Sequence, residues 1–261
     1  MHRGLFLWLL LVVSPGSVFA QFVLGDATVI GSFTSTVDTD TYTTASVTPL
    51  SGQLVLAAVH SAMSVGTDTI PTLSGTNGWN VTWTQVATVD YRTSGNERRV
   101  TLFRGVPSSG TAGTLTTAFS ATQVGRTLSV ISWANVDQTT NQGVVQSATA
   151  CAGGDCTGGT TATSLSVTLA AFGNANNATY GVFGVTGFDE DQVPGTGFTE
   201  LQDMVRELPT ERTQTQWRVD NDTSVDQSSA TTTIRGGIAV ELDYLEAVAA
   251  PRLRSLIGVG L

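Results

Sequence analysis

Residues 98–137 decide the fold. They read Arg-Arg-Val-Thr-Leu-Phe-Arg-Gly-Val at 98–106, Leu-Thr-Thr-Ala-Phe-Ser at 115–120 and Thr-Leu-Ser-Val-Ile-Ser-Trp at 127–133. Glycine, proline, serine and threonine at 107–114 separate the first run from the second. Short β-prone runs between such turn residues are typical of antiparallel strands. The last run is almost continuously apolar from Leu128 to Trp133, which predicts a strand covered on both faces.

The rest of the chain predicts more strands of the same kind. They are expected at residues 21–33, 34–46, 54–62, 83–91, 165–172, 178–185, 214–219, 230–234 and 237–245. Residues 65–78 read as a long loop, and residues 141–163 read as a Gly/Thr-rich excursion. These stretches are rich in the residues that favour turns over regular pairing.

A weak repeat relates the two parts of the chain. Residues 83–89 are echoed at 198–204, residues 100–106 at 215–219, and residues 127–133 at 237–243, in the same order. We interpret this as two interlocked sets of strands in one two-layer antiparallel β-sandwich, jelly-roll-like, spanning residues 21–246. Neither set alone has enough strands to bury both of its faces. The repeat predicts a strand at 199–208, although Leu201, Met204, Val205 and Leu208 have helical spacing and leave a short helix as the alternative.

Composition excludes several classes of partner. The formal net charge is −9, and all 12 basic residues are arginines. Nucleic-acid binding draws most of its affinity from phosphate neutralisation, so an acidic chain without a basic stripe argues against it. The same charge argues against anionic membrane surfaces. Without lysine the chain cannot form a Schiff base.

Both ends of the chain differ from the rest. Residues 1–20 read as a secretory signal peptide, with His2 and Arg3 before an apolar run and Val-Phe-Ala before Gln21. The alternative is an uncleaved anchor, but the run is short for a spanning helix. This predicts a secreted or cell-surface protein. Residues 247–261 form a C-terminal tail that reads as disordered, a sorting remnant, or a strand donated to a neighbouring copy. Residues 21–33 could be donated in the same way.

The two cysteines are Cys151 and Cys156, with Gly-Gly between them. In an exported chain, a close pair is most simply a disulfide that closes a short loop. A zinc site would need two more ligands nearby, and none is evident. A redox pair normally has the closer Cys-x-x-Cys spacing.

Candidate catalytic groups are few. The only histidine after residue 20 is His60, inside an apolar run, and no serine lies in a Gly-x-Ser-x-Gly elbow. The acidic pair Asp38 and Asp40 and the run Asp189, Glu190 and Asp191 are close neighbours, not acids held across a cleft. Solvated charge is the simplest interpretation, and a calcium site at Asp189, Glu190 and Asp191 is the alternative. No other cofactor is expected.

Aromatic side chains offer a second kind of site. Exposed tryptophan and tyrosine can stack on sugar rings, whereas buried ones fill a sandwich core. Trp83 and Trp133 are expected in the core. Trp79, which follows a loop glycine, and Tyr91, which precedes a turn, are the candidate ligand-binding platforms.

Several of these segments together resemble a known family. Gly78-Trp79, residues 83–87, residues 102–106 with 113–119, Trp-Ala-Asn-Val-Asp at 133–137, residues 197–201 and residues 237–242 resemble the recurrent pattern of secreted bacterial and phage-tail β-sandwich modules. The resemblance covers most of residues 22–245 and rests on turn and core residues. It implies an exported surface or adhesion-like protein, with no catalytic residues to carry over.

The sequence therefore predicts a non-enzymatic extracellular structural or adhesion-type protein, in a surface, matrix or appendage. Its expected partners are other copies of itself or a surface glycan. A carbohydrate-binding module is the first alternative, and a secreted hydrolase is the second.

Overall fold

The computed structural model describes residues 21–23, 25–63, 69–91, 97–152, 156, 160–187 and 190–245. Gln21–Leu245 forms one compact unit. Its described elements are antiparallel strands and two short 3-10 helices, Asn77–Trp79 and Asn141–Gly143. The predicted signal peptide at 1–20 and tail at 247–261 lie outside the described residues. None of the described helices is long and apolar enough to cross a membrane.

The first half of the unit forms two sheets. Its strands are β1 (Ala27–Ser35), β2 (Thr39–Thr43), β3 (Leu54–Met63), β4 (Thr72–Gly75), β5 (Thr84–Asp90), β6 (Glu97–Gly105), β7 (Leu115–Gln123) and β8 (Gly125–Trp133). One sheet has the order β1-β8-β3-β6-β5, and the other has the order β2-β7-β4. We call them the first inner sheet and the first outer sheet.

The second half follows the same plan with one continuous strand in place of two. Its strands are β9 (Val144–Cys151), β10 (Thr161–Thr168), β11 (Ala178–Thr186), β12 (Val193–Pro194), β13 (Thr199–Glu207), β14 (Thr210–Arg218) and β15 (Ser224–Leu242). The first part of β15, residues 224–234, pairs with β10 and β12 in the second outer sheet. Its last part, residues 235–242, pairs with β11 and β9 in the second inner sheet, which continues through β14 to β13.

The two halves therefore have equivalent strand orders. If β15 is divided at residue 235, the order β9-β15-β11-β14-β13 repeats β1-β8-β3-β6-β5, and β10-β15-β12 repeats β2-β7-β4. Alternation of consecutive strands between two sheets is the arrangement of a jelly roll. The predicted all-β, jelly-roll-like sandwich with an internal twofold repeat is confirmed.

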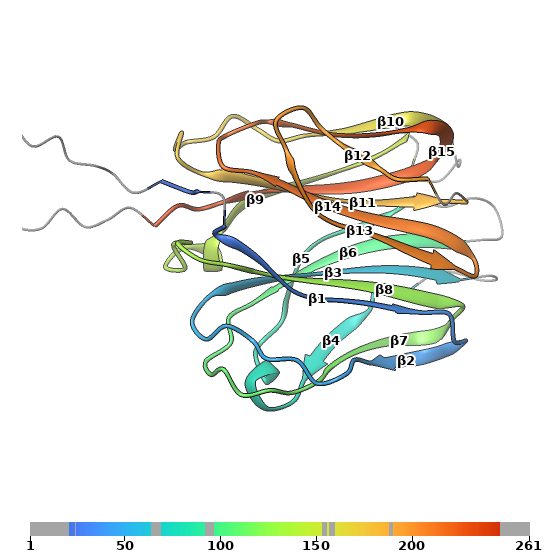
Figure 1. The fold of residues 1–261 in the computed structure, drawn as a ribbon, viewed down its shortest axis with the longest axis horizontal. Helices are drawn as coiled ribbons and strands as arrows, with labels where there is room; N and C mark the ends of the chain where they lie inside the picture. Colours follow the sequence, from blue (N-terminus) through green and yellow to red (C-terminus); the bar gives the residue numbers. More distant parts are fainter. Residues whose placement is uncertain are drawn as a thin grey trace, which may run out of the picture. The chain divides into compact units, whose positions relative to one another are not determined.

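The sheets stack in four layers, which Figure 1 shows from the side. The two inner sheets face each other across the central core, which includes Leu56, Leu102 and Trp133 from the first half and Tyr180 and Trp217 from the second. Each outer sheet covers the far face of its own inner sheet over a separate core. The inner strands are therefore covered on both faces, as predicted for residues 128–133, and every residue of β8 is buried.

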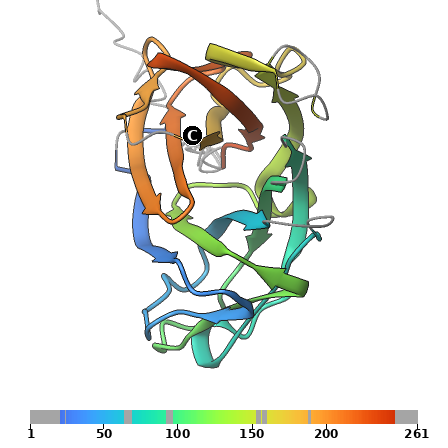
Figure 2. The ribbon, with the colours of Figure 1, turned by 90° about the vertical axis from the view of Figure 1, so that its right-hand side faces the viewer.

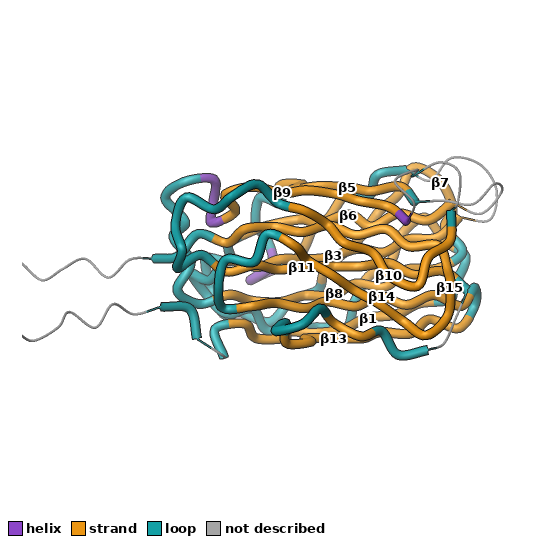
Figure 3. Tube along the Cα trace, turned by 90° about the horizontal axis from the view of Figure 1, so that it is seen from above, coloured by secondary structure: helices purple, strands orange, loops and turns teal. Residues whose placement is uncertain are grey.

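Two other views separate the halves and the ends of the strands. Figure 2 shows the unit end on, with the blue-to-green half below the yellow-to-red half. Figure 3 shows most strands running along one direction, so that loops gather at the two ends.

The prediction of interlocked strands was wrong. Among the described strands, those of each half pair only with one another, and an isolated bridge between Val136 and Tyr244 joins the halves. Each half covers its inner sheet with an outer sheet of its own. The two layers expected from the sequence correspond to the inner sheets alone. Residues 199–207 form strand β13, as the repeat predicts, so the helical alternative fails.

The sequence echoes fall on equivalent strands, but two of them are displaced by one residue. Phe103 was matched to Trp217, yet Phe103 packs in the first outer core and Trp217 in the central core. Successive strand residues point to opposite faces, so a one-residue displacement reverses the face of every match. The structure instead aligns Val130 with Ala239, since each faces its own outer sheet.

Candidate functional site

A cavity of about 530 Å³ opens between the two sheets of the first half, along the edge formed by β1 and β2. Residues from both strands line it, together with one residue at the start of β8. The lining is Ser32, Phe33, Thr34, Ser35, Val37, Thr39, Thr41, Tyr42, Thr43, Thr44, Ala45 and Arg126. Most of these residues carry hydroxyl groups, and none is a carboxylate, histidine or cysteine.

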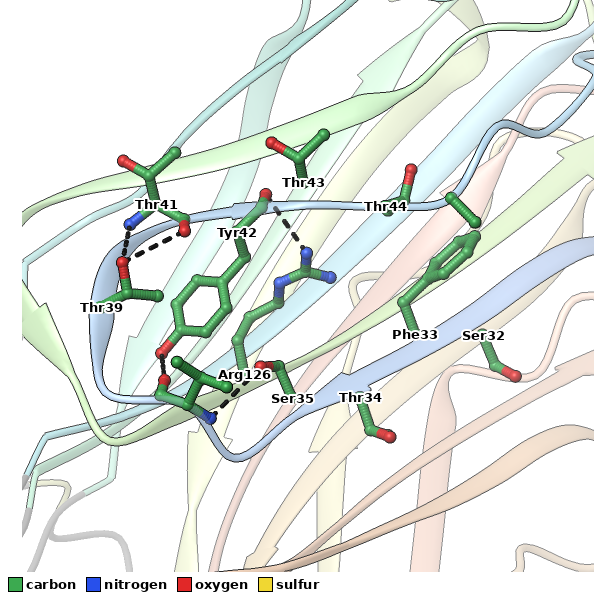
Figure 4. A pocket seen from close by; sticks show the side chains of 12 residues that line it. Ser32, Phe33, Thr34, Ser35, Thr39, Thr41, Tyr42, Thr43, Thr44 and Arg126 are labelled. Carbon is green, nitrogen blue, oxygen red and sulfur yellow. Dashed lines mark hydrogen bonds between the residues drawn. The ribbon is translucent and has the colours of Figure 1, made fainter.

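Strand alternation places the side chains of the cavity. In Figure 4, Ser35 of β1 and Tyr42 of β2 lie beside Arg126, whereas the ring of Phe33 lies further along β1 and points away from the guanidinium. Arg126 is paired with Ser35 in the sheet, so these two side chains share a face. Phe33 packs against the first outer core, which forms the apolar floor beside the polar groups.

Tyr42 is fixed by hydrogen bonds and by packing. Its hydroxyl donates to the carbonyl of Val37 at 2.9 Å, with the carbonyl of Gln123 at 3.1 Å as a second acceptor. Its ring packs edge-on against Phe119, with centroids 6.1 Å apart. Burial raises the pKa of Tyr42 to about 12, so the phenol is neutral at physiological pH. The ring is thus held in one position at the cavity wall.

Arg126 is the charged group of the cavity. It is 3% exposed, and its guanidinium lies 5.4 Å from the centroid of the Tyr42 ring. Its Nη2 donates a long hydrogen bond of 3.4 Å to the carbonyl of Tyr42, while Nε and Nη1 have no hydrogen-bond partner among the described residues. Burial lowers its pKa to about 10, so the side chain stays charged at neutral pH. The cavity thus has unused donors on a buried cation.

A second polar cluster is closed to solvent between the inner sheets. Glu211 of β14 is ion-paired with Arg206 of β13 and, across the central core, with Arg98 of β6. His60 of β3 contacts the hydroxyl of Thr213 through Nδ1 at 2.8 Å, and its Nε2 lies 3.5 Å from the Glu211 carboxylate. These contacts join the two halves. Because His60 and Glu211 are fully buried, the cluster offers no open surface to a ligand.

Both aromatic platforms predicted from the sequence are buried. Trp79 is 0% exposed, stacks on Trp83 with centroids 6.3 Å apart, and donates its indole N–H to the carbonyl of Val47 at 2.9 Å. Tyr91 is 1% exposed, and its hydroxyl lies 2.5 Å from Nε2 of His60. Both residues fill cores because outer strands and the opposite inner sheet cover them, so neither is a platform for a sugar ring.

The cysteines form the predicted disulfide. Cys151, the last residue of β9, is bonded to Cys156, and their Cα atoms are 5.1 Å apart. Cys151 is buried at the edge of the central core, and Cys156 packs against the same core. The bond therefore closes a short loop where the edge strand ends.

The acidic run is used in part for protein contacts. Asp189 lies outside the described residues. The carboxylate of Glu190 accepts the backbone N–H of Thr231 at 3.0 Å, and Asp191 lies 2.9 Å from Arg212. No group of three histidine, cysteine or acidic residues suited to a metal ion occurs among the described positions. A calcium site at Asp189, Glu190 and Asp191 stays a prediction.

Sequence reasoning missed Arg126 and Tyr42. The available signal was the pair Gly125-Arg126 at the start of the most apolar run of a chain that has no lysine. Comparisons with protein-family models, with curated proteins and with solved structures found no match for this chain. The cavity itself therefore supplies the functional argument.

Proposed function

We propose that the protein is an exported, non-enzymatic surface or adhesion-type protein whose first half binds a surface glycan in the cavity between β1 and β2. The polar surroundings of Arg126 at this open edge carry the proposal. The Ser35 hydroxyl, which shares a face with Arg126, and main-chain groups of the two edge strands can exchange hydrogen bonds with the hydroxyls of a sugar. Phe33 and Tyr42 add apolar area beside them, which is the usual composition of a small-molecule site.

Export is supported by the leader pattern at residues 1–20 and by the bond between Cys151 and Cys156. Disulfides persist in oxidising compartments and are rare in the cytosol. The resemblance to secreted surface modules agrees with this. A binding role is favoured over catalysis because the cavity lining lacks a general base or acid, and the described histidine, His60, is buried elsewhere.

A glycan array tests the proposal with a chain that begins at residue 21. The cavity is blocked by Ser35→Trp, because Ser35 points into it. The matched control is Thr28→Trp, an exposed position on the same strand that does not line the cavity. We expect the parent and the control to bind the same glycans and Ser35→Trp to lose them. An array without binding, or binding that survives Ser35→Trp, would contradict the proposal.

A further inference from the structure

Arg126 has a structural counterpart in the second half, which is Arg235. Arg126 is paired with Ser61 of β3, and Arg235 is paired with Val185 of β11, the equivalent strand. Val130 follows Arg126 by four residues and faces the first outer core. Ala239 follows Arg235 by four residues and faces the second outer core. The two arginines therefore occupy the same position in the repeat, where the chain passes from the outer to the inner sheet.

The second half provides acceptors for its arginine. Arg235 is 0% exposed. Its Nε donates to the carbonyl of Ala162 at 2.8 Å, and its Nη1 donates to Oε1 of Gln227 at 2.7 Å. Its Nη2 donates to the carbonyl of Thr231 at 3.1 Å and to the hydroxyl of Ser229. These neutral oxygens surround the guanidinium on all sides.

The first half provides almost no hydrogen-bond acceptors for Arg126. Only Nη2 of Arg126 has an acceptor, at 3.4 Å, and Nε and Nη1 have none among the described residues. The sheet edges above the two arginines also differ. In the second half β9 contacts β10, whereas in the first half the equivalent strands β1 and β2 are separated by the cavity. A buried cation without a counter-ion is costly, so such a group in a cavity indicates a ligand that completes it.

We propose that the cavity recognises an acidic sugar, whose carboxylate accepts hydrogen bonds from Nε and Nη1 of Arg126. This inference rests on the proposed glycan-binding function and adds the charge class of the ligand. A guanidinium presents two parallel N–H donors that match the two oxygens of a carboxylate. The Ser35 hydroxyl and the Tyr42 ring would then contact the sugar ring that bears the carboxylate.

The test compares each acid with its own neutral form. Trisaccharides of galacturonic, glucuronic and mannuronic acid are titrated into the chain beginning at residue 21 by calorimetry at pH 7, each beside its methyl ester and a sulfated neutral trisaccharide. Charged hydrogen bonds contribute about 1.5–3 kcal/mol, so we expect at least one acid to bind roughly tenfold or more tightly than its ester. Arg126→Gln should abolish this preference.

The control variant is Arg104→Gln, which removes the same charge from β6 outside the cavity and should keep the preference. Circular dichroism verifies folding. If Arg126→Gln does not fold, Arg126→Lys replaces it, because lysine keeps the charge without the paired donors and should reduce the acid-to-ester ratio.

The possible failures are distinct. If neutral sugars bind as tightly as acids, or if the preference survives the Arg126 variant, the acidic-sugar inference is wrong and the proposed glycan binding stands. If only the sulfated sugar depends on Arg126, the carboxylate assignment is wrong. If neither the titrations nor the array detects any sugar, the proposed function fails as well.

Discussion

The two halves of the unit share their strand order but differ along one edge. In the second half β9 and β10 contact each other, and the groups beneath them surround Arg235. In the first half the equivalent strands β1 and β2 stand apart, and Arg126 lies beneath an open cavity. The same buried arginine is thus enclosed by protein acceptors in one half and lies beside a cavity with few acceptors in the other.

If the proposed assignment holds, the repeated fold divides two tasks between its halves. The second half satisfies its arginine with glutamine, serine and main-chain oxygens, which stabilises the corner between its sheets. The first half leaves Nε and Nη1 of Arg126 without acceptors among the described residues, which lowers stability and, in our proposal, provides the place for a carboxylate. Functional sites commonly carry such a cost in stability. Four substitutions or titrations test this comparison.

The largest effect is expected for Glu211→Gln, because this carboxylate joins the two halves. Arg206 and Arg98 would lose their buried counter-ion, and breaking a buried ion pair typically costs about 3–5 kcal/mol. Urea unfolding measures the change. The exposed Glu207→Gln on β13 should be nearly neutral. A loss below about 1 kcal/mol for Glu211→Gln would show that the cluster does not hold the halves together.

Arg235→Met should destabilise the protein by about 3 kcal/mol or more. The change leaves the buried Oε1 of Gln227 without its donor, which costs about 1–3 kcal/mol, and it also removes the part-buried bonds to the carbonyls of Ala162 and Thr231. The same unfolding measurement checks it, with Arg104→Met as the control for loss of an arginine. An unchanged unfolding free energy would mean that the arginine is not a structural element of the second half.

His60 should make the unit sensitive to mild acid. Burial, with Arg206 and Arg98 nearby, lowers the pKa of His60 well below 6.5. Below about pH 6.5 the His60 side chain therefore binds a proton in the unfolded chain but not in the folded one. The free energy of unfolding then falls as the pH falls, by about 1.4 kcal/mol per pH unit.

His60 is the only histidine in residues 21–261, so this slope can be assigned to it. Unfolding free energies measured between pH 7.5 and 5 should show the loss in the parent and a flatter profile in His60→Gln. Equal slopes in the two proteins would contradict a neutral, buried His60.

The smallest effect should have the opposite sign. Arg126→Met removes a buried cation whose Nε and Nη1 lack acceptors among the described residues, so we expect stability to rise by about 1 kcal/mol at pH 7. Thermal unfolding without ligand measures this. A clear loss of stability would show that Arg126, like Arg235, is satisfied by the protein itself.

The sequence predicted the strands better than the contacts between them. Local alternation and the repeat correctly placed β13 and the doubly covered β8. Strand β9 was missed because it carries small residues and runs into a Gly/Thr-rich stretch, and β4 was missed because it is short. Trp79 and Tyr91 were misplaced, since their burial depends on strands far away in the chain.

The cavity could not be found from sequence for the same reason. Arg126 becomes a site only because β1 and β2 separate at one edge, and nothing near residue 126 encodes that separation. Arg126 follows a glycine, whereas its counterpart Arg235 precedes one, so the local sequences do not match. The sequence repeat also aligned β8 and the last part of β15 one residue out of register. Without the correct register, the two arginines could not be recognised as equivalent.

The most direct test observes both arginines at once. In nuclear magnetic resonance spectra of the chain beginning at residue 21, each arginine Nε–H gives its own signal, assigned with Arg126→Gln and Arg235→Lys. On titration with the preferred uronic-acid trisaccharide, we expect the Arg126 signal to shift to saturation and the Arg235 signal to stay in place. An Arg126 signal that does not move while the sugar binds, or equal shifts at both arginines, would contradict the assignment of the open cavity as the acidic-sugar site.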